Sequence, residues 1–145
     1  MSLTNAIENS LLDLLFTNDN LANIGDATGL RGSSTAGSYY VSLHTADPTE
    51  TGNQTSSECA YTNYARVAVA RSGAGWTVTD NSVSPAAEIS FAQCGGGTET
   101  VTHFGIGTDA SGTGTLILIG TVSPNISVSS GVTPKLTTST AVTAD

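Results

Sequence analysis

The chain has very little positive charge. Only four of its 145 residues are basic, against twelve acidic ones, and the formal net charge at pH 7 is −8. The basic residues are Arg31, Arg66, Arg71 and Lys135. A surface that binds nucleic acid needs clustered Lys and Arg to displace counterions, and anionic lipid is attracted by the same groups. We therefore expect neither nucleic acid nor a membrane surface among the partners.

Charge of either sign is scarce, at 11% of residues against about 25% in an average soluble domain. Thr, Ser, Gly, Asn and Ala take the place of charged residues. Such a surface has little self-repulsion and suits a protein that is packed against neighbours. Thr and Ser also fit a pleated β surface for purely structural reasons, so both interpretations stay open.

Cysteine and long apolar runs are scarce too. Cys59 and Cys94 are too few for a disulfide framework and lack the spacing of metal ligands. We expect free thiols in a reducing cytosol, with pairing after release into an oxidising medium as the alternative. The first ten residues lack the basic and apolar regions of a signal peptide, and no run is long enough to span a membrane. We expect the protein to be cytosolic when it is made.

Catalytic motifs are also missing. There is no Gly-x-Ser-x-Gly elbow to place a nucleophile near His44 or His103. The glycine-rich runs lack the Gly-Lys-Ser/Thr of a phosphate loop, and the acidic turn residues lack calcium-loop spacing. We expect no enzyme activity, no cofactor and no metal site.

The start of the chain predicts a helix. Thr4 is a suitable cap, the residues after it recur at helical spacing, and residues 18–20 end the pattern. The predicted apolar face consists of Leu3, Ile7, Leu11, Leu14 and Leu15. This face must cover either the protein's own sheet or another subunit.

The rest of the chain predicts a β fold. About eight short strands alternate with Gly-, Pro-, Asn- and Asp-rich turns, which is typical of a sandwich or jelly roll. The strands are expected at residues 39–43, 64–70, 76–79, 87–91, 101–106, 116–119, 126–128 and 132–136, and the Thr-rich tail is a candidate for one more. The expectation is one domain over residues 1–145, with the helix in 1–18 and a jelly-roll-like antiparallel β-sandwich in 39–145.

Residues 101–122 predict a hairpin in which Phe104 and Ile106 face the core. Its second arm, residues 116–119, is Leu-Ile-Leu-Ile and thus apolar on both faces. A sheet face that normally meets water must then be covered, either by the N-terminal helix or by a partner subunit.

These patterns suggest candidate subunit-contact residues but no catalytic ones. The candidates are Leu11 and Leu15 on the helix, Ile117 and Ile119 on the apolar arm, Arg31 in the loop of residues 25–38, and Arg66. Arg66 is expected to point outward, where it pairs with an acidic neighbour on another subunit or is simply an exposed arginine. A glycan-binding platform built from Tyr39, Tyr40, Tyr61, Tyr64 or Trp76 is an alternative use of the aromatic residues.

Five blocks of sequence together carry a resemblance to a known family. They are residues 3–16, 39–52 (with Leu-His-Thr-Ala-Asp-Pro-Thr), 64–69 (with Tyr-Ala-Arg), 87–91 and 101–120 (with Thr-His-Phe-Gly-Ile-Gly). In this order they resemble small structural proteins of tailed bacteriophages. Such proteins are often labelled tail fibre protein, and they resemble the jelly-roll cement or decoration proteins of phage heads.

The resemblance implies a virion protein without catalytic function. It implies a cement protein on the capsid surface, bound to the major capsid protein and to copies of itself as a dimer or trimer, that stabilises the head. The alternative is a tail-fibre or tail-associated protein with a receptor-binding role. A host carbohydrate-binding module is the third hypothesis.

Overall fold

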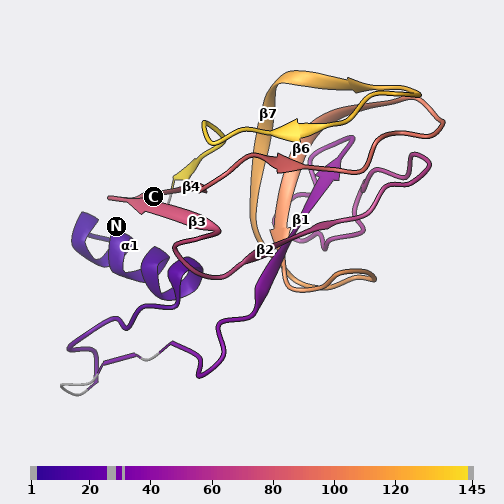
Figure 1. The fold of residues 1–145 in the computed structure, drawn as a ribbon. Helices are drawn as coiled ribbons and strands as arrows, with labels where there is room; N and C mark the ends of the chain where they lie inside the picture. Colours follow the sequence, from indigo (N-terminus) through magenta and orange to yellow (C-terminus); the bar gives the residue numbers. More distant parts are fainter. Residues whose placement is uncertain (1–2, 26–28, 31, 144–145) are drawn as a thin grey trace. The chain divides into compact units, whose positions relative to one another are not determined.

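A computed structural model describes residues 3–25, 29–30 and 32–143 (Figure 1). Its contacts divide the chain into two compact units. Unit 1 comprises Met1–Ser38, Ala70–Ala87 and Thr137–Asp145, and unit 2 comprises Tyr39–Val69 and Glu88–Leu136. Over the described ranges the protein has nine strands, antiparallel sheets and an N-terminal helix, which confirms the mainly β class. The jelly-roll topology and the single domain stay predictions.

Unit 1 begins with the predicted helix. Helix α1 (Asn5–Leu12) continues into a π-helical segment, η1 (Asp13–Thr17), and Asn18 ends it in the left-handed conformation at φ 66°. Thr4 lies at the N-cap, where its carbonyl oxygen accepts the Ile7 and Glu8 amides. Its side chain makes no capping hydrogen bond, so the predicted position of the helix start is right and the expected side-chain cap is wrong.

The buried stripe of this helix differs from the predicted one. Glu8, Leu12 and Phe16 are buried at intervals of four residues, and the Phe16 ring meets Trp76 edge-on with ring centroids 5.1 Å apart. Leu11 and Leu15 are only half-buried, while Leu3 is 50% exposed. The expected phase was therefore wrong, because the aromatic contact of Phe16 decides which side of the helix turns inward.

The helix covers a sheet of its own unit. It contacts the hairpin of β3 (Trp76–Thr79) and β4 (Ser82–Pro85), and β9 (Val142–Thr143) extends this sheet in the order β3-β4-β9. Strand β3 has its predicted bounds and β9 confirms the extra strand in the tail. Strand β4 was not predicted from the sequence. It pairs with β3 after a turn in which Asp80 has a φ of 53°.

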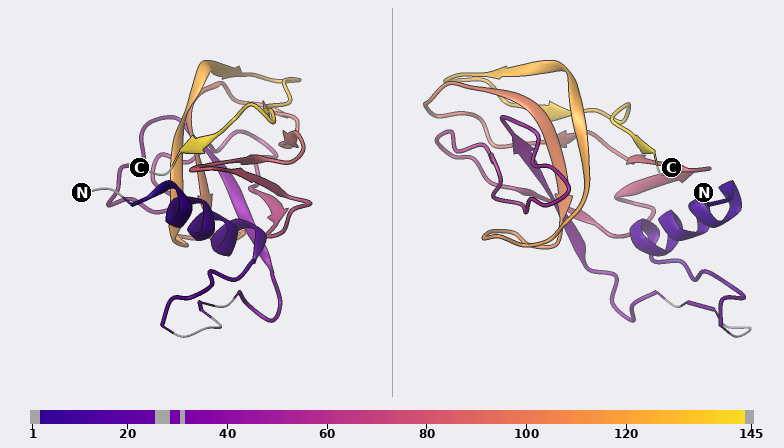
Figure 2. Two further views of the ribbon diagram at one scale, coloured as in Figure 1. Left: turned by 90° about the vertical axis from the view of Figure 1, so that its left-hand side faces the viewer. Right: turned by 180° about the vertical axis from the view of Figure 1, so that it is seen from behind.

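Unit 2 contains the main sheet, which has the order β2-β1-β6-β7. The strands are β1 (Ser38–His44), β2 (Val67–Ala70), β6 (Glu99–Gly107) and β7 (Leu116–Val128). Both views in Figure 2 show the long β7 running beside β6. A two-stranded sheet of β5 (Ile89–Ser90) and β8 (Lys135–Leu136) completes the unit.

One face of the main sheet forms the apolar core of unit 2. Val41 pairs with Ile106 and Leu43 with Phe104, and all four side chains are buried, so the predicted core role of Phe104 and Ile106 is confirmed. Val101 is buried as well, although alternation from Phe104 would place it on the opposite face. The pairing of β6 with β7 changes register between Val101 and His103.

Strand β7 is longer than expected. Two strands, at 116–119 and 126–128, were predicted where the structure has one strand of 13 residues. Gly120 lies in its middle, and a Cβ atom there would come within 2.4 Å of the Phe104 ring. Glycine is thus required by the close packing of the two paired strands and does not mark a turn.

Candidate functional site

The second face of the main sheet is polar but also buried. Ser42 and His44 on β1 have no solvent exposure, and Gly105 and Gly107 lie near them on β6. A Cβ atom on Gly107 would lie 2.3 Å from Cδ of Gln54. Gly107 therefore leaves room for a covering segment, which we call the cover loop (residues 45–63), whereas Gly105 leaves room for the Ser42 and His44 side chains.

Gln54 fixes the cover loop to the turn after β6. Its side chain is completely buried, its Oε1 accepts the Asp109 amide at 2.9 Å, and its Nε2 donates to the Asp109 carbonyl at 3.2 Å. The Gln54 amide donates to the Thr113 carbonyl at 2.9 Å. Residues 50–63 have the composition of a long polar loop, yet the Gln54 side chain belongs to the interior, because its polar groups find partners there.

His44 forms a second tie to the cover loop. Its Nδ1 lies 2.8 Å from the Ser56 carbonyl oxygen, and its Nε2 lies 2.8 Å from Ser42 Oγ. Since a carbonyl only accepts, Nδ1 carries the proton and Nε2 accepts the Ser42 hydroxyl. Burial lowers the pKa of His44, which favours this neutral form.

The Ser42–His44 pair has the composition of a nucleophile and its base. Both residues are completely buried, so no substrate atom reaches Ser42 Oγ in this structure. The hydrogen bonds of the pair connect β1 to the cover loop, and this is a structural role.

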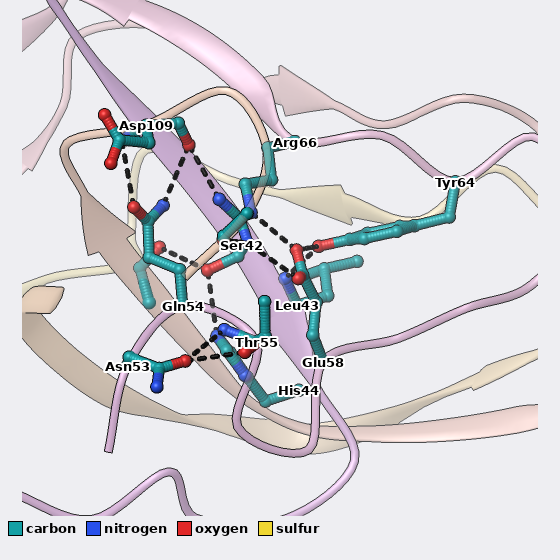
Figure 3. Close-up of polar contacts among 12 residues, drawn as sticks. Ser42, Leu43, His44, Asn53, Gln54, Thr55, Glu58, Tyr64, Arg66 and Asp109 are labelled. Carbon is teal, nitrogen blue, oxygen red and sulfur yellow. Dashed lines mark hydrogen bonds and ion pairs between the residues drawn. The ribbon is translucent and has the colours of Figure 1, made fainter. Parts of the chain in front are cut away.

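Arg66 and Glu58 complete the attachment (Figure 3). Arg66 Nε donates to Glu58 Oε1 at 2.7 Å, and Nη1 donates to the Asp109 carbonyl at 2.8 Å. Nη2 donates both to Glu58 Oε2 and to the Gly112 carbonyl. The hydrogen bond with Glu58 raises the pKa of Arg66. We call Gln54, Glu58 and Arg66 the polar brace.

Tyr64 links the polar brace to β1. Its hydroxyl donates to Glu58 Oε1 at 3.0 Å and accepts the Leu43 amide at 2.9 Å. Burial raises the pKa of Tyr64, so the hydroxyl keeps the proton that it donates.

The expected outward orientation of Arg66 is wrong. Its side chain is 3% exposed, and strand β2 begins only at Val67, so strand alternation does not set its direction. The Glu58 carboxylate and the carbonyls of residues 109 and 112 hold the guanidinium inside unit 2.

The apolar arm of the hairpin borders a groove. Leu116, Ile117, Leu118 and Ile119 are all half-buried, and together with Thr49, Glu50 and Gly52 they line a space of about 210 Å³. The cover loop therefore borders this arm across the groove. It leaves the four side chains of the arm only half-buried.

The other candidate contact residues are distributed over the chain. Ile117 and Ile119 lie together at the groove on β7, and Leu11 and Leu15 lie half-buried on the helix segment of unit 1. Arg31 falls outside the described residues. None of the residues of the polar brace other than Arg66 was singled out from the sequence. The sequence signal that could have indicated them is Gly-x-Gly at residues 105–107, because two glycines at alternate positions leave space on one face of the strand for another segment.

The aromatic residues belong mainly to the cores. Trp76 is 2% and Tyr61 4% exposed, Tyr61 packs edge-on against Tyr64, and Tyr64 stacks on Phe91. A glycan platform around Trp76 is therefore not present on the described surface.

The cysteines are free and buried, and burial raises the pKa of the Cys59 thiol to about 12. Within residues 3–25, 29–30 and 32–143, no group of three or more His, Cys, Asp or Glu side chains is placed to hold a metal ion. No helix in the same ranges is long and apolar enough to cross a membrane.

These features define the class of the protein as a mainly antiparallel β protein whose buried polar groups attach its own loops. The particular family follows from comparison with known proteins. Residues 2–143 match the family described as podophage GP4 fiber I protein gp80. Since the match covers nearly the whole chain, the chain belongs to this family and is a phage structural protein, as the resemblance predicted. No curated protein matches the sequence.

Proposed function

We propose that this protein is a non-enzymatic structural subunit of a podophage virion that acts by binding its neighbours. The proposal rests on one observation, which is that the polar side chains of the site are buried and are bound within their own unit. Ser42, His44 and Gln54 are completely buried, and Arg66 is bound within its own unit. Beside these buried polar residues, the apolar residues 116–119 of β7 are only half-buried and can therefore contact a partner.

The fibre apparatus is the location that we favour, because the family is described as a fiber protein. In this role the polar brace keeps the cover loop and the turn of residues 108–115 in fixed positions. Loops that are held in this way lose little conformational entropy when they bind a partner. Half-buried Leu11, Leu15, Ile117 and Ile119 are the proposed contacts with other subunits.

A capsid cement protein is the second candidate. It would bind the outside of the major capsid protein lattice and stabilise the head through many small contacts whose avidity adds up over the shell. The low content of charged residues, 11%, favours a surface that spends its time packed against others.

The test is to locate and count the protein in purified virions. Gold-labelled antibody and quantitative mass spectrometry of separated heads and tails would report both quantities. A few copies with the tail fraction are expected. Hundreds of copies on heads would replace the fibre location by the cement role, and absence from purified virions would overturn the structural proposal itself.

Contact residues are tested by incorporation into particles. L11D and I119K are expected to lower the amount of the protein in virions, and T138K in the exposed tail is the matched control. Equal incorporation of all three variants would contradict the assigned contacts.

A further inference from the structure

The two outer strands of the main sheet are protected very differently. An outer strand exposes unpaired backbone groups, and natural proteins limit the hazard with short strands, charges and proline. Strand β2 is only four residues long. Strand β7 is 13 residues long, and its first seven residues, Leu-Ile-Leu-Ile-Gly-Thr-Val, contain neither charge nor proline.

This seven-residue segment has the composition of a strand that pairs. It is rich in β-branched and apolar residues and uncharged, which is typical of segments that add to another strand. In the sheet order, β7 has a neighbour on the β6 side only among the described strands. Its alternate backbone N–H and C=O groups therefore point toward an outer edge where another strand can dock.

The charge distribution indicates which strand fits. Two copies of a chain with a net charge of −8 repel each other, and they meet with the least repulsion where the surface is uncharged. No residue of β7 is charged, so an antiparallel pair of these strands brings no like charges of β7 itself together. Glu50 is the acidic residue that lines the groove beside the apolar part of β7. At physiological salt its repulsion with charges of a second copy is screened beyond about 8 Å.

We infer that residues 116–122 of β7 pair antiparallel with the same segment of a second copy, across a two-fold axis at Ile119. The main sheets of the two copies then form one continuous sheet, and the interface is isologous, as in most two-fold dimers. Side chains of the incoming strand occupy the groove beside Thr49, Glu50 and Gly52. The inference deepens the proposed function and rests on it for the need to assemble.

The oligomeric state of the purified full-length protein tests the pairing. Sedimentation equilibrium over a wide range of protein concentration is expected to show a monomer–dimer equilibrium. Strand pairs of this length belong to small interfaces, so affinity in the micromolar range is expected. Because like-charged copies are screened by salt, the dimer should become tighter as salt is raised.

Charged substitutions on the segment provide the decisive comparison. I117K and I119K should each raise the dimer dissociation constant at least about tenfold, equivalent to about 1.4 kcal/mol. T138K in the exposed tail is the control and should leave it unchanged. Circular dichroism verifies that the variants fold. A folded wild type that stays monomeric, or a dimer that both lysine variants retain, would overturn the inference.

Single-cysteine scanning fixes the direction of the pairing. Each residue from 116 to 122 is replaced in turn by Cys, and cross-linking under mild oxidation is measured. Antiparallel pairing predicts a maximum at I119C, because only a residue on the two-fold axis meets its own copy. Efficient cross-linking at every position would indicate parallel pairing and contradict the proposal. Wild-type protein, whose Cys59 and Cys94 are buried, gives the background.

The oligomeric state and the presence of the protein in virions are measured independently, so the two experiments test this inference and the proposed function separately. A monomeric protein that is still found in virions would overturn only the β7 pairing. A dimer that is absent from virions would overturn only the virion role.

Discussion

Among the described residues, each unit contains one arginine that binds backbone carbonyls, and the two arginines differ in whether an acidic side chain also binds them. Arg66 in unit 2 binds the carbonyls of residues 109 and 112 together with the Glu58 carboxylate. Arg71 in unit 1 binds the carbonyls of Leu14 and Leu15 at the end of the helix, and that of Ala36. Arg66 thus holds two loops together, whereas Arg71 supplies donors and a positive charge to a helix C-terminus.

The difference predicts which unit depends more strongly on its arginine. Removing Arg66 leaves a carboxylate whose side chain is 15% exposed without its cation. Removing Arg71 leaves carbonyl groups that are only partly buried, and water can replace part of the lost hydrogen bonding. The arginine of unit 2 should therefore contribute more to stability.

The largest effect is expected for R66A. Breaking a largely buried ion pair by removing one partner costs about 3 kcal/mol or more. Because the two units need not unfold together, hydrogen exchange of amides in β1 and β6 is the appropriate measurement. The control is K135A, which removes an exposed ion pair with Glu88 and should cost less than about 1 kcal/mol. Equal losses for the two variants would contradict the assigned role of Arg66.

R71A should have the next largest effect, about 2 kcal/mol, because several charge-assisted hydrogen bonds are lost. Amide exchange should accelerate in α1 and η1 and remain unchanged in β6. R71K keeps the charge and should recover only part of the loss, since one ammonium group cannot reproduce the guanidinium fork. Full recovery by lysine would show that charge alone is needed.

Q54A sharpens the comparison within unit 2. It leaves the Asp109 amide without its side-chain acceptor and opens space over Gly107, at a cost of about 1–3 kcal/mol. Limited proteolysis should then cut the cover loop faster. Q93A is the control, because Gln93 is exposed and donates a single side-chain hydrogen bond to the Gly131 carbonyl. Unchanged proteolysis in Q54A would contradict the attachment of the cover loop by this side chain.

The smallest effect is the pH dependence contributed by His44. Its pKa in the folded protein is lowered by burial, while the unfolded chain has the ordinary value of about 6.5. The unfolded state therefore binds the proton first, so stability is full above about pH 6.5 and falls as the pH is lowered through that value. Glu58, Arg66 and His103 also act on the titration of His44.

Urea unfolding of unit 2 at pH 7.5 and pH 5.5 measures this effect. H44Q should reduce the difference between the two pH values, whatever its effect on stability at pH 7.5. An undiminished difference in H44Q would assign the pH dependence to other groups.

Local patterns predicted much of the fold. The bounds of β3, the start of the N-terminal helix and the core positions Phe104 and Ile106 were all evident from spacing and alternation. These features depend on residues close together in the chain. The phase of the helix was not evident, because it depends on the contact between Phe16 and Trp76, 60 positions later.

The polar brace shows the same limit more clearly. A stretch rich in polar residues predicts an exposed loop, and for the tip near Thr49 and Glu50 this is correct. For Gln54 it is wrong, because Gly107 and Gly114 leave space that only the folded chain brings opposite Gln54.

The sequence by itself determined that this protein is acidic, mainly β and related to phage structural proteins, since composition, alternation and motif order are properties of the chain. Only the tertiary structure decided that Arg66 is internal, that the cover loop is attached by Gln54, and that β7 is a single strand at the outer edge of its sheet. Those outcomes depend on which distant groups meet, because a buried donor, acceptor or charge is stable only where the fold supplies its partner.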